Sequence, residues 1–120
     1  MSKKLLKLIL SNAGCPDSTQ YTGSGPMNAT FDTDQGLVIR SVTLHCVGQP
    51  GAAEDFVIKH KLPGQSPAFD VTRLQQPMQG VTDVVLTDPI FVSKGDVITF
   101  EWANGDNVQW GLNVIHGRNA

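Results

Sequence analysis

The sequence has 120 residues, which suits one domain and is short for two. Nine basic against eleven acidic residues give a formal net charge of −2, so no cationic surplus is available to bind nucleic acid. The longest apolar run is far shorter than a membrane span, so no membrane partner is predicted either. Charged residues make up only 17%, below the usual quarter, which indicates that part of the surface contacts other proteins.

The first fifteen residues partly resemble a secretory signal peptide. Basic residues precede an apolar stretch, and Cys15 stands where a lipoprotein signal would be cleaved. However, Lys7 interrupts this stretch, which is already too short for the apolar core of a signal peptide. Asn12 also stands where a lipoprotein cleavage site has an aliphatic residue. We therefore predict a strand over residues 4–10 in place of a signal.

The sequence predicts a division into an arm and a body. Residues 1–26 would form an N-terminal strand and flexible arm, with a loop over 12–26, and residues 27–120 a sandwich domain. The strand 4–10 either pairs with a neighbouring subunit or is the first strand of the chain's own sandwich. The residues of the arm predicted to bind a partner are Leu5, Leu6, Leu8, Ile9 and Leu10.

The rest of the chain is patterned for β-structure. Twelve Gly and seven Pro residues separate short runs rich in Val, Ile, Thr and Phe, and no stretch has the period of an amphipathic helix. We predict strands at 4–10, 27–32, 37–47, 55–61, 69–74, 81–87, 96–102 and 108–115. About eight short strands separated by turns predict an all-β fold, a single sandwich of jelly-roll or related Greek-key type.

Alternation of apolar and polar residues in three of these strands predicts the core. Its residues are Val42, Leu44, Cys46, Ile98, Phe100, Trp102, Val108, Trp110, Leu112 and Val114. The two tryptophans could instead stack on a sugar ring, but their phase with aliphatic neighbours favours the core. Between the last two strands, the Asn104-Gly105 pair within residues 103–107 predicts a hairpin.

No catalytic or metal-binding constellation is predicted. The three histidines, His45, His60 and His116, are far apart in sequence, and no Gly-x-Ser-x-Gly or Cys/His signature is present. Cys15 and Cys46 match no metal or redox motif, so we predict two free thiols. The sequence therefore predicts a protein that is not an enzyme and holds no cofactor.

Several segments follow one another in a characteristic order between residues 27 and 117. They are Ser41–Cys46, Glu54–Ile58, Gly80–Leu86, Asp88–Val92, Lys94–Phe100, Ala103–Asn107 and Trp110–Val114. In this order and spacing, the sequence resembles a group of small structural proteins encoded by tailed bacteriophages and prophages. Residues 1–20 lie outside the resemblance.

The resemblance implies a non-enzymatic virion component, above all a protein that decorates or cements the capsid. It implies the major capsid protein and further copies of the chain as partners. The chain would be located in the virion after assembly in the host cytoplasm, which agrees with free thiols. An accessory protein of the neck or tail and a glycan-binding module that uses the 103–107 end are the alternatives. Glycan binding needs an exposed indole, whereas the structural role needs both indoles buried and an apolar contact surface elsewhere.

Overall fold

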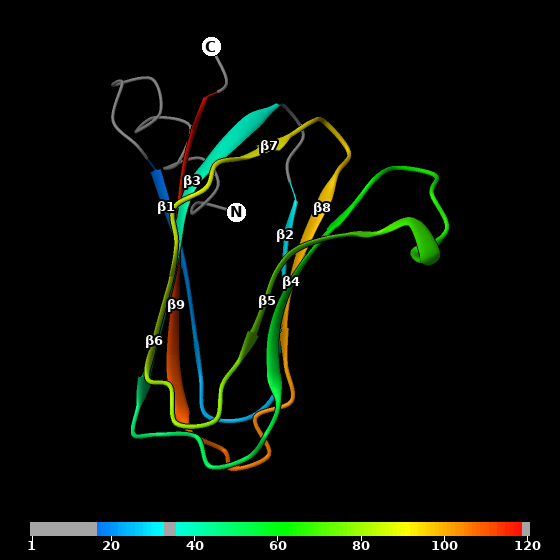
Figure 1. Cartoon of the computed structure of the whole chain (residues 1–120). Helices are drawn as coiled ribbons and strands as arrows, with labels where there is room; N and C mark the ends of the chain where they lie inside the picture. Colours follow the sequence, from blue (N-terminus) through cyan, green and yellow to red (C-terminus); the bar gives the residue numbers. More distant parts are fainter. Residues whose placement is uncertain (1–16, 33–35, 119–120) are drawn as a thin grey trace.

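The computed structural model describes residues 17–32 and 36–118. These residues form two antiparallel sheets packed face to face, and one short 3-10 helix (Figure 1). The elements are β1 (Asp17–Gly23), β2 (Met27–Asp32), β3 (Leu37–Val47), β4 (Asp55–Lys61), η1 (Pro67–Phe69), β5 (Val71–Pro77), β6 (Asp83–Leu86), β7 (Ile90–Val92), β8 (Val97–Trp102) and β9 (Gln109–Arg118).

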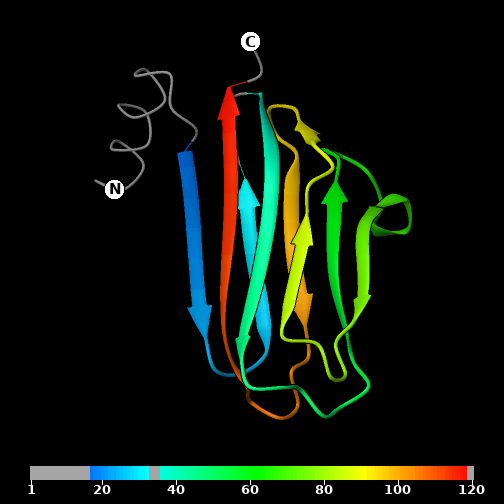
Figure 2. The same cartoon turned by 60° about the vertical axis from the view of Figure 1, so that its left-hand side comes forward.

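The strand order is that of a jelly roll. Sheet A has the order β1-β9-β3-β6, with the short β7 pairing with the beginning of β3, and sheet B has the order β2-β8-β4-β5 (Figure 2). The chain changes sheet at most connections, and it stays in one sheet only from β4 to β5 and from β6 to β7. This winding confirms the predicted all-β sandwich of jelly-roll type.

Most of the predicted strands coincide with strands of the structure. The predictions for β2, β3 and β4 agree in every residue, and those for β8 and β9 agree in most. The strand predicted at 69–74 begins later, as β5, because η1 occupies residues 67–69. The strand predicted at 4–10, with Leu5, Leu6, Leu8, Ile9 and Leu10, lies outside the described residues.

Two strands were not predicted. The interpretation of residues 12–26 as a loop is wrong for residues 17–23, which form β1 and pair with β9 along their whole length, from Asp17 opposite His116 to Gly23 opposite Trp110. The sandwich therefore begins before residue 27. The second missed strand, β7, has only three residues, too few to show a period of two.

The predicted hairpin at residues 103–107 is also wrong. β8 belongs to sheet B and β9 to sheet A, so this segment crosses between the sheets. Asn104, which is 1% exposed and has a φ of 46°, anchors the crossing. Its Nδ2 donates hydrogen bonds of 2.9 Å to the carbonyl oxygens of Gly25 and Val108, and its Oδ1 accepts one of 3.0 Å from the Val108 N–H.

Replacing Asn104 by alanine should therefore lower the free energy of unfolding by about 2–4 kcal/mol, because buried backbone groups lose their partners and alanine disfavours a positive φ. Asn104→Gly is the matched control, since glycine accepts this φ but cannot make the hydrogen bonds. We expect the glycine variant to fall between the wild type and the alanine variant in urea denaturation. Equal losses in both variants would mean that the backbone conformation contributes nothing.

The core lies between the two sheets, where the predicted alternation places it. Nine of the ten predicted core residues are buried, and Val108 is partly buried and packs against them. Cys46 is among the buried residues and its thiol is free, whereas Cys15 lies outside the described residues. Burial, and to a smaller extent the negative charge of Asp83, raises the pKa of the Cys46 thiol, so this group stays protonated and packs as a small apolar side chain.

Candidate functional site

The outer face of sheet B carries charged side chains. Alternation along β4 and β8 directs Asp55, Lys59, Lys61 and Glu101 outwards. Lys59 Nζ lies 3.4 Å from Glu101 Oε1, and Lys61 Nζ lies 3.3 Å from Asp70 Oδ2. Such exposed ion pairs contribute little to stability, but they keep this face well hydrated. Sheet B thus presents an ordinary solvent-facing surface.

The outer face of sheet A is poor in charge. Its β1 and β9 side chains are hydroxyl and amide groups together with Ile115, and the middle of β3 adds two more hydroxyl groups. Among the side chains that the structure describes in these strands and in β6 and β7, the ionisable ones on this face are Arg40, His45 and Asp83. The two outer faces of the sandwich thus differ in charge.

The Asp83 carboxylate on this face already has partners. His45 Nδ1 lies 2.6 Å from Asp83 Oδ1, and the Thr82 hydroxyl donates a 3.0 Å hydrogen bond to Asp83 Oδ2. The hydrogen bond from His45, and next to it the one from Thr82, lowers the pKa of Asp83. With Nδ1–H directed at the carboxylate, the neutral His45 ring keeps Nε2 as an acceptor.

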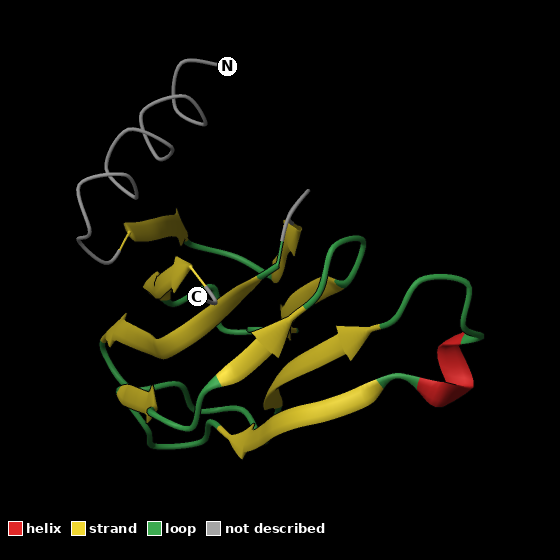
Figure 3. Ribbon diagram, turned by 90° about the horizontal axis from the view of Figure 1, so that it is seen from above, coloured by secondary structure: helices red, strands yellow, loops and turns green. Residues whose placement is uncertain are grey.

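Exposed apolar side chains interrupt this neutral face. Val47, Val85 and Phe91 come from β3, β6 and β7, and their exposed fractions are 63%, 62% and 61%. All three point away from the core, because their neighbours in sequence are the buried members of the alternation. The other large exposed apolar residues of the described chain lie at the β4–β5 connection, which projects from the sandwich around η1 (Figure 3); they are Leu62, Phe69 and Val71.

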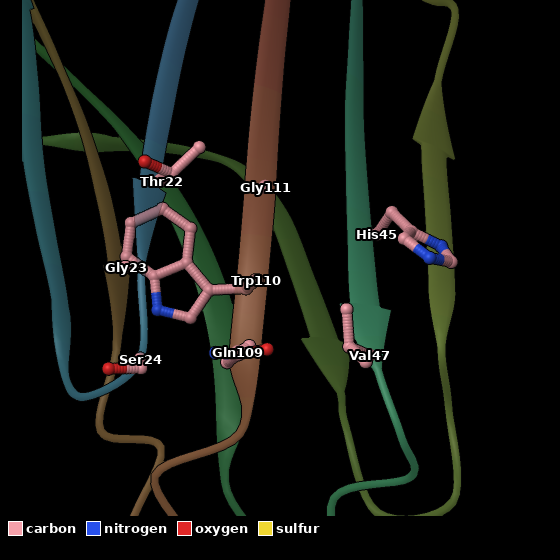
Figure 4. Close-up of a pocket in the computed structure, with 8 residues that line it drawn as sticks. All are labelled: Thr22, Gly23, Ser24, His45, Val47, Gln109, Trp110 and Gly111. Atoms are coloured by element: carbon pink, nitrogen blue, oxygen red, sulfur yellow. The ribbon is translucent and has the colours of Figure 1, made fainter.

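A shallow depression of about 500 Å³ lies at one end of the β1, β9 and β3 strands of sheet A (Figure 4). It is open to solvent, and its lining residues are Thr22, Gly23, Ser24, His45, Val47, Gln109, Trp110 and Gly111. Gly111 stands in the row between Thr22 on β1 and His45 on β3. The missing side chain at this position leaves the central strand β9 uncovered.

The histidines are not brought together. His45 is exposed on sheet A, and His116 is buried, with Nε2 3.0 Å from Thr19 Oγ1 and its ring 5.1 Å from that of Phe31. His60 is buried in sheet B. Among the described residues, no group of three or more His, Cys, Asp or Glu side chains could hold a metal ion.

The buried residues His60 and Asp96 form a network with Arg73, which is exposed. Arg73 donates to His60 Nδ1 from Nη2 at 2.7 Å and from Nε at 3.1 Å, so Nδ1 is an acceptor and the ring is neutral. The opposite nitrogen, Nε2–H, then donates to Asp96 Oδ2 at 2.8 Å, which also accepts the Ser93 N–H at 3.0 Å. Both ring nitrogens are occupied, so His60 has no free nitrogen for general base catalysis.

Both tryptophans are buried, at 2% exposure for Trp102 and 8% for Trp110. The Trp110 indole N–H donates a 2.9 Å hydrogen bond to the carbonyl oxygen of Gly25. The 103–107 end therefore lacks the exposed indole on which the glycan-binding alternative depended. Among the described residues, no helix is long and apolar enough to cross a membrane.

Comparisons with known proteins show the fold. No protein-family model matches the sequence, and no curated protein matches it. The core of the Drosophila protein NLP, whose structure addresses pentamer formation and histone binding, is 13% identical, with a TM-score of 0.53 over 82% of this chain and 96% of that one. A chitosan-binding module of a Paenibacillus chitosanase/glucanase is also 13% identical, with a TM-score of 0.50 over 82% of this chain and 76% of that one.

A chain from the capsid of a Helicobacter pylori bacteriophage is 16% identical, over 85% of this chain and 92% of that one. Its TM-score of 0.44 is too low to support an argument. Because sequence identities are this low, the similarities establish a jelly-roll-like β-sandwich and no specific family.

Proposed function

We propose that this chain is a non-enzymatic structural protein of a tailed-phage virion, a decoration or cement protein that binds the major capsid protein and further copies of itself. The observation that carries the proposal is the outer face of sheet A, where charge is sparse and Val47, Val85 and Phe91 are each more than half exposed. The cores of protein interfaces are depleted of charged residues, and exposed apolar groups mark surfaces that bind other proteins.

The resemblance of the sequence to small phage structural proteins supports the virion as the setting. The burial of both indoles also supports a structural role over glycan binding at the 103–107 end, because a sugar ring would find no aromatic platform there. A neutral face of this kind excludes steering by charge, so its partner should be recognised by shape and apolar contact.

Cryo-electron microscopy of intact particles of the virus that encodes the chain tests the proposal. We expect density for the sandwich on the capsid, with the outer face of sheet A turned towards the shell. Density at the neck or tail would replace the decoration role by that of an accessory protein. Absence of the chain from purified particles would contradict a virion function altogether.

Deletion of residues 1–11 tests the predicted arm. If these residues bind a neighbouring subunit, the truncated protein should unfold at an unchanged urea concentration but no longer bind particles. β1 is an edge strand of sheet A, so the alternative is that residues 4–10 extend the chain's own sheet. In that case the truncated protein should unfold earlier or aggregate.

A further inference from the structure

Three glycines lie within strands of the described chain, and two of them are covered by flat side chains. They are Gly23, Gly111 and Gly117. A Cβ atom at Gly23 would lie 2.7 Å from Cζ2 of Trp110, whose indole ring occupies that place. A Cβ atom at Gly117 would lie 3.2 Å from Nε of Arg40, whose planar guanidinium group covers that strand. At Gly23 the indole ring leaves no room for a side chain, whereas at Gly117 a side chain would have to displace the Arg40 guanidinium group slightly.

At Gly111, in contrast, no side chain of the described residues packs on the glycine. Apart from its two neighbours in the chain, no described residue has a heavy atom within 4 Å of the position that its Cβ would take, and its φ is not among the positive values. A glycine in the interior of a central strand weakens the sheet, and it often marks a place where another molecule approaches the backbone closely. The fold would therefore accept the methyl group of alanine at this position.

The residues that line the depression above Gly111 are suited to binding an uncharged group. No lysine, arginine, aspartate or glutamate is among its lining residues, and the Nδ1 atom of its His45 is already bonded to Asp83. Val47 provides apolar surface, and the side chains of Thr22, Ser24 and Gln109 provide hydroxyl and amide groups (Figure 4). A ligand that is flat, largely apolar and able to make one hydrogen bond fits this lining.

We propose that this depression receives an aromatic side chain of a partner protein, which covers Gly111 as Trp110 covers Gly23. The inference rests on the proposed docking through sheet A, which it deepens by naming the contact. Aromatic residues are enriched at the centres of protein interfaces, where they fill pockets and contribute most of the binding energy. A tyrosine ring would pack on the glycine backbone and direct its hydroxyl group to the polar rim.

The first test uses p-cresol, which has the shape of a tyrosine side chain, and two-dimensional amide NMR spectra of the isotope-labelled full chain. We expect millimolar binding, with shifts concentrated at Thr22, Gly23, His45 and Gly111. Methyl β-D-glucopyranoside serves as the neutral sugar probe and methylguanidinium as the planar cation, and both should leave these amides unchanged. Shifts with the sugar or the cation in place of p-cresol, or no shifts with p-cresol at all, would overturn the proposal.

Variants at Gly111 make the test specific. Gly111→Val fills the depression and should weaken p-cresol binding by about tenfold or more, as expected when an anchor pocket is closed. Its urea midpoint should not fall, because valine favours a strand and its Cβ meets no atom outside its chain neighbours within 4 Å. Thr72→Val, on the exposed edge strand β5 of sheet B, is the matched control and should bind like the wild type. Unchanged binding by Gly111→Val would refute the site.

A second variant and a particle assay complete the design. Gly111→Ala adds one methyl group and should weaken binding less than valine, so a graded loss supports the site even if the valine variant folds poorly. In co-sedimentation with particles, wild-type binding that survives in both Gly111 variants would refute the contact while leaving the virion function intact. Failure of the wild type to co-sediment would instead refute the proposed function.

Discussion

Replacing Phe100 by alanine should lower the free energy of unfolding by about 3–5 kcal/mol, the range for deletion of a buried aromatic ring. Phe100 is 0% exposed and lies on β8, in register with Ala29 on β2 and Ile58 on β4. Its ring centroid is 6.3 Å from that of Tyr21 on β1, so it also connects the two sheets. The cavity left by the deletion would open in the middle of the core, where surrounding strands cannot collapse into it.

Val85→Ala is the control for this experiment, since it also shortens an apolar side chain but at a position that is 62% exposed. We expect a change within about 0.5 kcal/mol for this variant, as for other surface substitutions. Urea denaturation followed by tryptophan fluorescence measures both. A similarly small loss for Phe100→Ala would mean that β8 presents its other face to the core.

The success and failure of the strand predictions have one physical cause. The alternation in β3 and β8 is visible in the sequence because one face of each strand is buried and apolar. β1 lacks this signal, because its outward residues are hydroxyl and amide groups and its inward residues include Thr19 and Gly23. It becomes a strand through pairing with β9, a contact between segments far apart in the sequence.

The turn at residues 103–107 shows a second limit of sequence analysis. The Asn-Gly pair correctly indicates a tight change of direction, and Asn104 does take a positive φ. A local turn signal, however, does not specify whether the strands on either side pair with each other or enter different sheets. That choice depends on the whole jelly roll, in which β8 and β9 each lie between two other strands.

The candidate site was only partly predictable. The low charge of the chain indicated a protein-binding surface, but its location required the register that brings His45 of β3 opposite Asp83 of β6. Once strands are assigned, the outward positions of β3 and β9 can be seen to be nearly free of charge, and this is the signal that sequence analysis could have used. Whether a side chain covers Gly111 depends on how β1, β9 and β3 lie side by side, and no pattern in the sequence indicates it.

The hydrogen-bond network around the buried Asp96 predicts a loss of stability comparable to that of the core deletion. Asp96→Ala would leave the His60 Nε2–H and the Ser93 N–H without an acceptor, in a place where Asp96 is 4% and His60 2% exposed. Each unsatisfied buried donor costs about 1–3 kcal/mol, and bonds to a charged acceptor are at the upper end, so we expect a total of about 3–5 kcal/mol. The turn before β8 and the beginning of the β4–β5 connection should loosen together, because Asp96 and Arg73 hold the same imidazole ring.

Asp96→Asn distinguishes hydrogen bonding from charge. The amide oxygen of asparagine can still accept a hydrogen bond from His60, but the negative charge that balances Arg73 through the neutral imidazole is lost. We therefore expect an intermediate loss of stability in urea denaturation at neutral pH, with the full loss in Asp96→Ala. If asparagine is as damaging as alanine, the charge of Asp96 dominates the network. If neither substitution lowers the urea midpoint, the network does not stabilise the fold, and the end of the sandwich at the β4–β5 connection depends on apolar contacts alone.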